Sequence, residues 1–159
     1  MKCLFNTKGG GYITTCVITI VIAMIFSAVL FYAQCMTIIQ TTRANTELVL
    51  EGFITQNSVQ IYDSLKQGHD LTEYFDENYY FSQISSRFSL DIQGNTLYSY
   101  NEAGETIYAM TDPNVTYKVD KALKLKASYT VMIPVQFAGE TLFYMRVPLT
   151  VTRSLTLKT

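Results

Sequence analysis

Few residues in this chain have side chains suited to catalysis or metal binding, and those few are far apart. His69 is its only histidine, and the three cysteines, Cys3, Cys16 and Cys35, all precede residue 36. A cysteine–histidine nucleophile or a zinc site needs such side chains to converge. A lone histidine is more often a surface residue than a ligand. We therefore expect no metal site, no cofactor-binding site, and no disulfide in the part of the chain after Cys35.

Paired carboxylates are the second arrangement that can do chemistry, because two such groups can act as acid and base. Asp76–Glu77 and the pair Glu102/Glu105 are the candidates. Each pair lies on a predicted helix or turn, where acidic side chains normally face water. The chain also has no Walker A loop, no G-x-S-x-G and no G-x-G-x-x-G sequence. No catalytic residue is predicted, and the chain is not expected to be an enzyme.

Charge is small and unevenly distributed along the chain. The 159 residues carry a formal net charge of −1, with Lys2 and Lys8 ahead of a long uncharged run and all 13 acidic residues after it. No basic stripe is interleaved with aromatic residues, so nucleic acid is not an expected partner. The residues after the uncharged run leave room for one small domain.

The uncharged run, Gly9 to Thr42, is the feature around which the chain is organised. Between Tyr12 and Met36 it consists mainly of Ile, Val, Ala, Phe, Leu and Met. A helix that spans a bilayer needs about 20 such residues. The alternative is a buried helix of a soluble protein, but the remaining residues are too few to surround so apolar a helix on all sides. We therefore predict a transmembrane helix over residues 12–36, with the lipid bilayer as a partner.

Flanking charges predict how this span is inserted. Lys2 and Lys8 precede it, whereas a mixed set of Arg43, Glu47 and Glu51 follows it. Positive flanks tend to stay in the cytoplasm, so residues 1–11 are expected to form a short basic cytoplasmic tip and the rest to lie outside the cell membrane. A cleaved secretory signal is the alternative. The apolar run exceeds the usual length of about 7–15 residues, however, and no A-x-A pattern closes it.

The same helix is expected to continue outside the membrane, over residues 37–68. From Thr37 to Gln67 there is no proline, and Gly68 is a natural helix end. One apolar stripe on this helix is expected to face the domain's own sheet, and it consists of Leu50, Phe53, Ile54, Ile61 and Leu65. A weaker stripe on nearly the opposite side is the candidate helix assembly face, and it consists of Ala44, Leu48, Val59 and Tyr62. The alternative is two helices with a break near Arg43 or Gly52.

A domain of helix and sheet is expected over residues 69–159. Asp70 and Glu73 have the spacing of a helix cap, and they precede a helix predicted over residues 71–87. From Phe88 onward apolar residues alternate with polar ones, which predicts strands. The first strands are expected at residues 88–92, 97–100 and 106–110, with turns at 94–95, 101–105 and 112–114.

The strongest strand pattern comes last. Odd positions from Val115 to Phe137 are apolar apart from Lys121, and the alternation resumes at Phe143. Gly139 between the two runs predicts a long hairpin, in which Phe137 opposes Phe143 and Ile133 opposes Val147. Pro134 and Pro148 cannot donate to a ladder, so part of this hairpin is expected to be an outer edge or a protruding ribbon. The expected fold class is α+β: a long N-terminal helix, a second short helix, and an antiparallel sheet ending in that hairpin.

The junction before the span resembles that of type IV pilin-like proteins. There a short basic leader ends in glycine, and an apolar helix begins just after it. Here Lys8 is followed by Gly9, Gly10, Gly11 and then Tyr12. By that resemblance a prepilin peptidase would cut between Gly11 and Tyr12. The family usually has Glu at the fifth mature position, whereas this chain has Cys16.

The whole order of elements is similar to the TadE-like minor pseudopilins of tight-adherence (Flp) pilus systems. The resemblance implies a non-catalytic, membrane-anchored subunit of a bacterial pilus or of a pilus-assembly or secretion machine. Its expected partners are other pilin-like subunits, pilus-assembly membrane proteins and a prepilin peptidase. The alternative is a single-pass membrane-anchored extracytoplasmic binding or sensor module. Such receptors usually need a cytoplasmic output domain, for which residues 1–11 leave no space.

Overall fold

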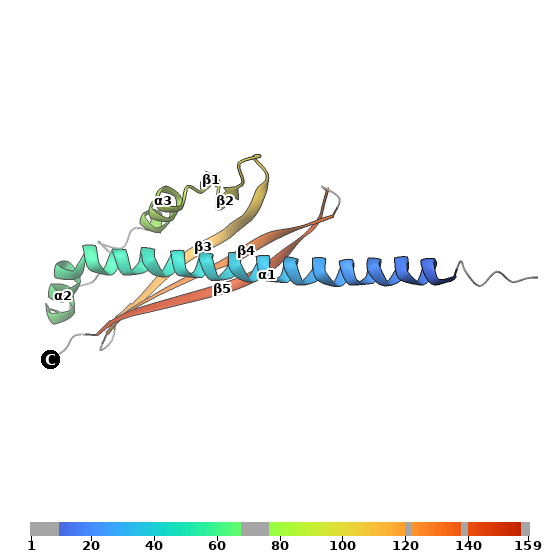
Figure 1. Ribbon diagram of the computed structural model, residues 1–159. Helices are drawn as coiled ribbons and strands as arrows, with labels where there is room; N and C mark the ends of the chain where they lie inside the picture. Colours follow the sequence, from blue (N-terminus) through green and yellow to red (C-terminus); the bar gives the residue numbers. More distant parts are fainter. Residues whose placement is uncertain (1–9, 68–76, 120–121, 138–139, 157–159) are drawn as a thin grey trace, which may run out of the picture. The chain divides into compact units, whose positions relative to one another are not determined.

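The computed structural model describes residues 10–67, 77–119, 122–137 and 140–156, and it divides into two compact units between Thr37 and Ile38. Its helices are α1 (Gly10–Gln56), α2 (Ser58–Gln67) and α3 (Glu77–Phe88). Its strands are β1 (Asp91–Gln93), β2 (Thr96–Tyr100), β3 (Thr106–Val119), β4 (Ala122–Phe137) and β5 (Glu140–Thr156) (Figure 1). The strands form one antiparallel sheet in sequence order. The predicted α+β fold is confirmed.

In the first unit, α1 is apolar on every side and satisfies its own hydroxyl groups. An 18-residue window of the helix has a mean hydropathy of 2.6, and none of it is buried. Thr15 donates to the carbonyl of Gly11 at 2.8 Å, and Thr19 donates to the carbonyl of Thr15 at 2.9 Å. Hydrocarbon offers a hydroxyl no partner, so hydrogen bonds of this kind suit a helix in a bilayer. By length and composition α1 fits a membrane anchor.

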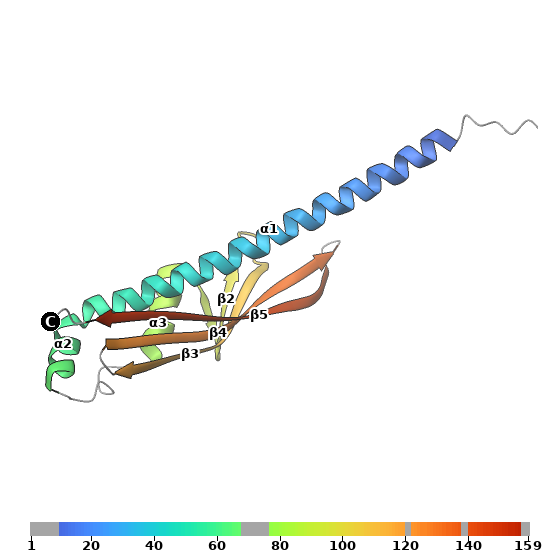
Figure 2. The same ribbon diagram turned by 90° about the horizontal axis from the view of Figure 1, so that it is seen from below.

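The helix predicted to reach Gln67 without a break is two helices, as the alternative had it, and the break lies at Asn57, a few residues after Gly52. α1 ends at Gln56 and α2 begins at Ser58. Figures 1 and 2 both show α2 turned away from the axis of α1. Between them, the Asn57 side chain donates to the carbonyl of Phe53 at 3.0 Å, the same oxygen that the Asn57 backbone N–H contacts at 3.1 Å. Asparagine competes with the backbone in this way, which weakens a helix at that point.

The helix predicted over residues 71–87 is observed as α3. Its expected cap at Asp70 and Glu73 lies outside the described residues. Phe88, which was expected to begin the first strand, ends this helix instead. Ser89 follows with a left-handed φ of 51°, and the N–H of Leu90 donates to the carbonyl of Ser85 at 3.1 Å. This pattern closes the last turn of many helices.

β3 continues through the turn that was predicted at residues 112–114. Its pairing with β4 shifts by one residue between Thr111 and Asn114, and Asp112 has a left-handed φ of 49°. The extra residue moves the core-facing positions from even to odd numbers, so that Met110 and Val115 are both buried. A bulge therefore accommodates Pro113 without ending the strand.

The alternating run from Val115 to Phe137 belongs to two paired strands rather than one. β3 ends at Val119 and β4 begins at Ala122. The β4–β5 hairpin is confirmed, but its predicted register is wrong by two residues. Phe143 lies opposite Val135, and Met145, rather than Val147, lies opposite Ile133. A shift of two keeps the same side chains on the core face, so the apolar pattern alone does not distinguish the two registers.

Both prolines of this hairpin lie where no ladder hydrogen bond is lost inside the sheet. β5 is an edge strand, and it contains Pro148. β3 pairs with β4 only as far as Met132, so β4 has β5 as its only neighbour at Pro134. The predicted edge and protruding ribbon are confirmed. We call this two-stranded extension, residues 133–137 and 140–145, the β4–β5 ribbon.

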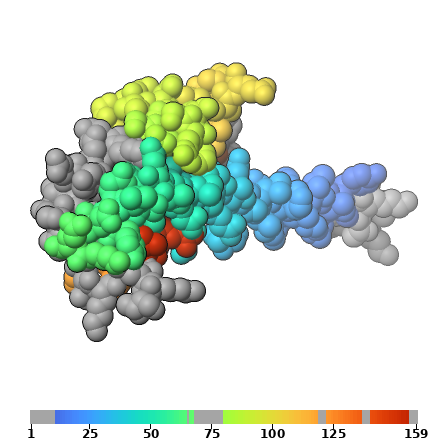
Figure 3. All heavy atoms as spheres, turned by 90° about the vertical axis from the view of Figure 1, so that its left-hand side faces the viewer, coloured from blue at the N-terminus to red at the C-terminus, as the bar shows by residue number. Residues whose placement is uncertain are grey.

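The helices of the second unit cover one face of the sheet. Odd-numbered side chains of β4 from Leu123 to Ile133 are at most 4% exposed, whereas Lys124 and Lys126 between them are exposed. Of the stripe predicted to face the sheet, Leu50, Phe53 and Ile61 are buried. Figure 3 shows α3 on one side of α1 and β5 on the other. Each fully buried Leu, Ile or Phe side chain contributes about 1.5–3 kcal/mol, so this face supplies most of the unit's stability.

Candidate assembly surface

The orientation of α1 on the sheet is fixed by a buried group of hydroxyls, which we call the hydroxyl cluster: Thr42, Thr46, Tyr80, Tyr108 and Tyr129. Thr42 and Thr46 donate to the carbonyls of Ile38 and Thr42, at 2.7 and 3.0 Å. The hydroxyls of Thr46 and Tyr80 are 3.2 Å apart, and Tyr80 also donates to the sulfur of Met110 at 3.7 Å. A chain of contacts thus joins α1 through α3 to β3.

The three tyrosines of the cluster are held in their neutral form. Burial raises the pKa of Tyr80, Tyr108 and Tyr129, because ionisation would place a charge in an apolar environment. The Tyr129 hydroxyl has no hydrogen-bond partner among the described residues. The Thr46 hydroxyl beside it lowers the pKa of Tyr129 against this rise, but Thr46 donates to the carbonyl of Thr42 and lies 3.2 Å from the Tyr80 hydroxyl. The cluster is suited to positioning rather than to proton transfer.

An ion-pair clamp joins α1 to the edge strand. Arg153 of β5 lies 2.6 Å from Glu47 and 3.1 Å from Glu51, one helical turn apart. Arg43 also approaches Glu47, at 3.4 Å, but it is largely exposed. A half-buried guanidinium that bridges two carboxylates holds its geometry better than an exposed pair does. The clamp and the hydroxyl cluster together determine which side of α1 faces outward.

The predicted assembly face is exposed in the second unit, but it does not form one straight stripe. Ala44 is exposed and Leu48 is 53% exposed on α1, while Val59 and Tyr62 are 68% and 42% exposed on α2. The break at Asn57 separates the two pairs. The Nζ of Lys66 lies 4.5 Å from the centre of the Tyr62 ring, so a cation covers one side of that ring. Leu48 is therefore the large apolar side chain that α1 presents on this face.

The predicted peptidase junction lies at the start of α1. The helix begins at Gly10, so Gly11 and Tyr12 are both helical. A Cβ placed at Gly11 would have no atom within 4 Å, and Tyr12 is 82% exposed. The bond between them is unobstructed by other parts of the described chain.

A second exposed apolar patch was not predicted from the sequence. Leu142, Phe143 and Tyr144, near the start of β5, are 62%, 59% and 49% exposed. Three consecutive large apolar residues interrupt the alternation that a half-buried strand requires. That interruption is visible in the sequence, and it could have been used to predict an exposed apolar patch there.

The described residues of the second unit line surface hollows. One of about 350 Å³ is lined by Tyr80, Phe81, Asn95, Asp112, Pro113, Asn114 and Val115. Within it the Asn95 side chain donates to the Asp112 carboxylate at 3.1 Å, so these two polar side chains are paired with each other. Another, of about 360 Å³, lies beside the Arg153 clamp.

In the part of the chain that the structure describes, no group of three or more His, Cys, Asp or Glu residues is placed to hold a metal ion. Cys16 and Cys35 are free thiols. Comparison with protein families, curated proteins and solved structures finds no match for this chain. Its function must therefore be argued from its own residues.

Proposed function

We propose that this chain is a non-catalytic, membrane-anchored, pilin-like subunit, similar to TadE-like minor pseudopilins, of a bacterial pilus or a pilus-assembly or secretion machine. It is anchored by α1 with its N-terminus in the cytoplasm and its sheet-bearing unit outside. The observation that carries the proposal is the helix itself. α1 runs for 47 residues and supplies both the apolar segment and the helix that packs on the sheet.

The construction of α1 supports an assembly role. One side of the second half of α1 is buried within the second unit, at Thr46, Val49 and Phe53. The opposite side presents Ala44 and Leu48 to solvent. Helices in membranes associate by close packing of small residues, and Ala23, Ser27 and Ala28 provide such residues in the apolar segment. A neighbouring subunit can therefore pack along α1 without disturbing the domain.

Processing is tested by measuring the mass of the full-length chain made with and without a prepilin peptidase. The expected result is loss of residues 1–11 only when the peptidase is present, because Gly11 and Tyr12 form its junction. Gly11→Leu should block the cut, while Gly52→Ala, at a helical position without a left-handed φ, should not. A chain that keeps its full mass with an active peptidase would contradict processing.

Assembly is tested by cross-linking in the membranes of cells that make the full set of pilus proteins. A photo-reactive residue at Ala44 should form adducts with pilin-like subunits, and Leu48→Lys should abolish them because a charge then faces the neighbour's apolar side chains. Ser86→Lys adds the same charge on the exposed side of α3 and should leave the adducts intact. Equal cross-linking by Leu48→Lys and the unmodified chain would overturn the assembly role.

The alternative, an anchored binding or sensor module, is favoured by one observation. The hollow beside Tyr80 and Phe81 combines aromatic and polar walls, as small-molecule sites do. Protection of its residues from hydrogen exchange by a small ligand, in membranes without any assembly partner, would support this alternative.

A further inference from the structure

We propose that the β4–β5 ribbon is a second membrane contact, and that Leu142, Phe143 and Tyr144 rest in the interfacial region of the bilayer that holds α1. This inference rests on the proposed membrane anchor but does not require assembly with other subunits. Its starting point is the exposure of these three side chains, 62%, 59% and 49%, at one end of the sheet.

The ribbon is apolar on both of its faces. Phe143 lies opposite Val135 on the helix side, and Tyr144 lies opposite Pro134 on the open side. Leu142 is the extra residue where the pairing shifts between Val135 and Gln136. Farther along β5 the open side is polar, for example at Thr150 and Thr152. A ribbon that needed only to be soluble would keep this polar pattern to its end. The change at Leu142–Tyr144 indicates a surface that is not facing water on either side.

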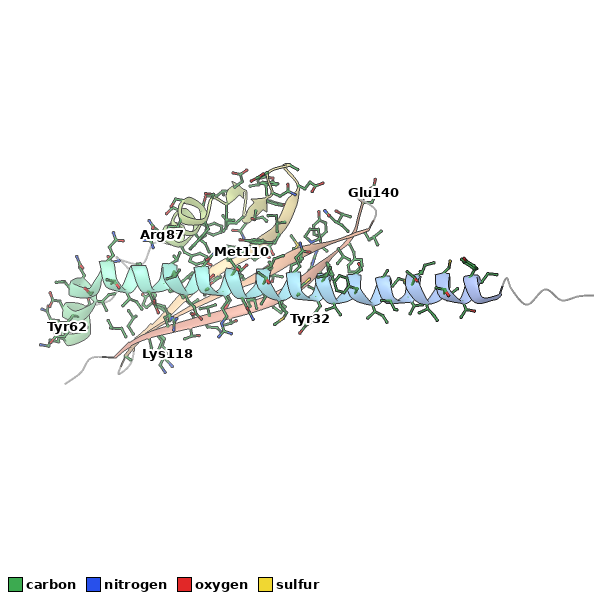
Figure 4. All side chains as sticks on the ribbon, in the orientation of Figure 1. Tyr32, Tyr62, Arg87, Met110, Lys118 and Glu140 are labelled. Carbon is green, nitrogen blue, oxygen red and sulfur yellow. The ribbon has the colours of Figure 1, made fainter. Side chains whose placement is uncertain are left out.

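The ribbon lies at the end of the second unit at which α1 enters it. Figure 4 labels Glu140 at one end of the sheet and Tyr62, on α2, at the other. α1 enters the unit at Ile38 and leads to α2 at the far end, and β5 runs from Glu140 to its clamp with Glu47 and Glu51. Ile38 follows the apolar segment directly in the chain, so this is the end of the second unit to which the proposed anchor is joined. The ribbon extends beyond the strand β3 on that same end.

The order of residue types along β5 matches the polarity of a bilayer interface. Leu142 and Phe143 are purely apolar, Tyr144 combines a ring with a hydroxyl, and Arg146 two residues later is exposed. Aromatic residues with a polar end are favoured at the headgroup level, and arginine is favoured beside lipid phosphates.

Glu140 sets the depth of this contact. Its side chain is exposed at the start of β5, and a carboxylate in the hydrocarbon core is costly. The ribbon is therefore expected to lie along the interface, with Phe143 at the level of the first acyl carbons, rather than to cross the bilayer. We propose a lipid surface as the occupant, because the apolar side chains of Leu142 and Phe143 adjoin Tyr144 and Arg146, which suit the headgroup level. A second copy of the chain is the competing occupant.

The sequence contains no tryptophan, so an introduced one is a selective probe. We would make Phe143→Trp in the full-length chain and reconstitute it in vesicles of phosphatidylethanolamine and phosphatidylglycerol with acyl chains brominated near the carbonyl or near the methyl end. Tyr62→Trp, 42% exposed at the opposite end of the unit, is the matched control. Leu142→Trp is the second variant, in case the first does not fold.

The expected result is that the tryptophan of Phe143→Trp emits at shorter wavelength than that of Tyr62→Trp and loses most of its emission to the bromines near the carbonyl. The quenching should not change when the protein is diluted with more lipid. Equal emission of the two variants, with no quenching in Phe143→Trp or Leu142→Trp, would overturn the contact while leaving the anchor intact. Blue-shifted emission that returns to the control value when more lipid is added would also overturn the lipid contact, because the tryptophan would then be covered by a second copy of the chain. Chains that do not float with the vesicles would overturn the anchor itself.

Discussion

Removing the hydroxyl of Tyr129 should stabilise the protein, whereas the same change at Tyr80 should destabilise it. Both hydroxyls belong to the hydroxyl cluster, and both residues are only 4% exposed. The Tyr80 hydroxyl lies 3.2 Å from Thr46 and donates to Met110 at 3.7 Å. That of Tyr129 has no partner among the described residues. Two chemically identical substitutions in one core are therefore expected to have opposite signs.

The magnitudes follow from what each hydroxyl loses on burial. A buried polar group without a partner costs about 1–3 kcal/mol, so Tyr129→Phe should recover a large part of that amount. Tyr80→Phe removes a hydrogen bond with a net value of about 1 kcal/mol. For a unit of this size, each kcal/mol corresponds to a change in Tm of about 4 °C. Tyr129→Phe should thus melt several degrees above Tyr80→Phe, with the unmodified chain between them.

Thermal unfolding of the full-length chains in one detergent, followed by near-ultraviolet circular dichroism, measures the difference. Thr46→Val supplies a check, because it removes the partner that Tyr80 uses. The loss in Thr46→Val/Tyr80→Phe should be smaller than the sum of the two single losses. If Tyr129→Phe lowers the Tm as much as Tyr80→Phe does, the Tyr129 hydroxyl has a partner, such as a buried water, and the reasoning is refuted.

Three further outcomes are expected of the second unit. Arg153→Met should lower the free energy of unfolding by about 1 kcal/mol, because Glu47 and Glu51 lose their shared cation; an unchanged denaturant midpoint would show that the clamp adds nothing. The free energy of unfolding should be constant below a pH of about 10, which is the ordinary pKa of tyrosine, and it should fall above that pH. The buried tyrosines have raised pKa values in the folded chain, so they ionise first in the unfolded chain and alkaline pH favours unfolding. The loss is about 1.4 kcal/mol per pH unit for each such tyrosine, and a flat alkaline profile would contradict their burial. Gly52→Ala should raise the Tm, because alanine has a helix propensity about 1 kcal/mol more favourable than that of glycine. The new Cβ should fit, because its nearest neighbour is the flexible guanidinium of Arg87 at 3.5 Å. A lower Tm would show that Arg87 cannot move.

Much of the fold was predictable because periodicity in the sequence reports which side of an element is buried. The stripe of Leu50, Phe53 and Ile61 and the odd positions of β4 are buried as the pattern indicates. The prolines correctly indicated an edge and a ribbon. The turn predicted at Asp112 was wrong, because a strand can absorb one extra residue in a bulge when its partner strand continues.

The candidate site was less predictable than the fold, because exposure depends on what else packs nearby. Thr42 and Thr46 are polar and interrupt the apolar stripes, yet the structure buries them with tyrosines that are distant in sequence. The exposed patch at Leu142–Tyr144 resembles ordinary strand sequence until the pairing shows that β3 accompanies β4 only as far as Met132 of β4. Neither arrangement follows from a local pattern, since both depend on contacts between strands and helices.

The sequence by itself determined the long apolar helix, the α+β order of its elements, the alternation of the last strands and the absence of cysteine beyond Cys35. These are properties of neighbouring residues, and composition and periodicity record them directly. Only the tertiary structure decided that the helix breaks at Asn57, that Phe143 pairs with Val135, and that Arg153 joins β5 to α1. A register shift of two residues leaves every side chain on the same face, so the apolar pattern does not select the register. The ion pair between Arg153 and Glu47 joins residues 106 positions apart, so no local pattern indicates it. Both are determined by contacts that form only when the chain packs.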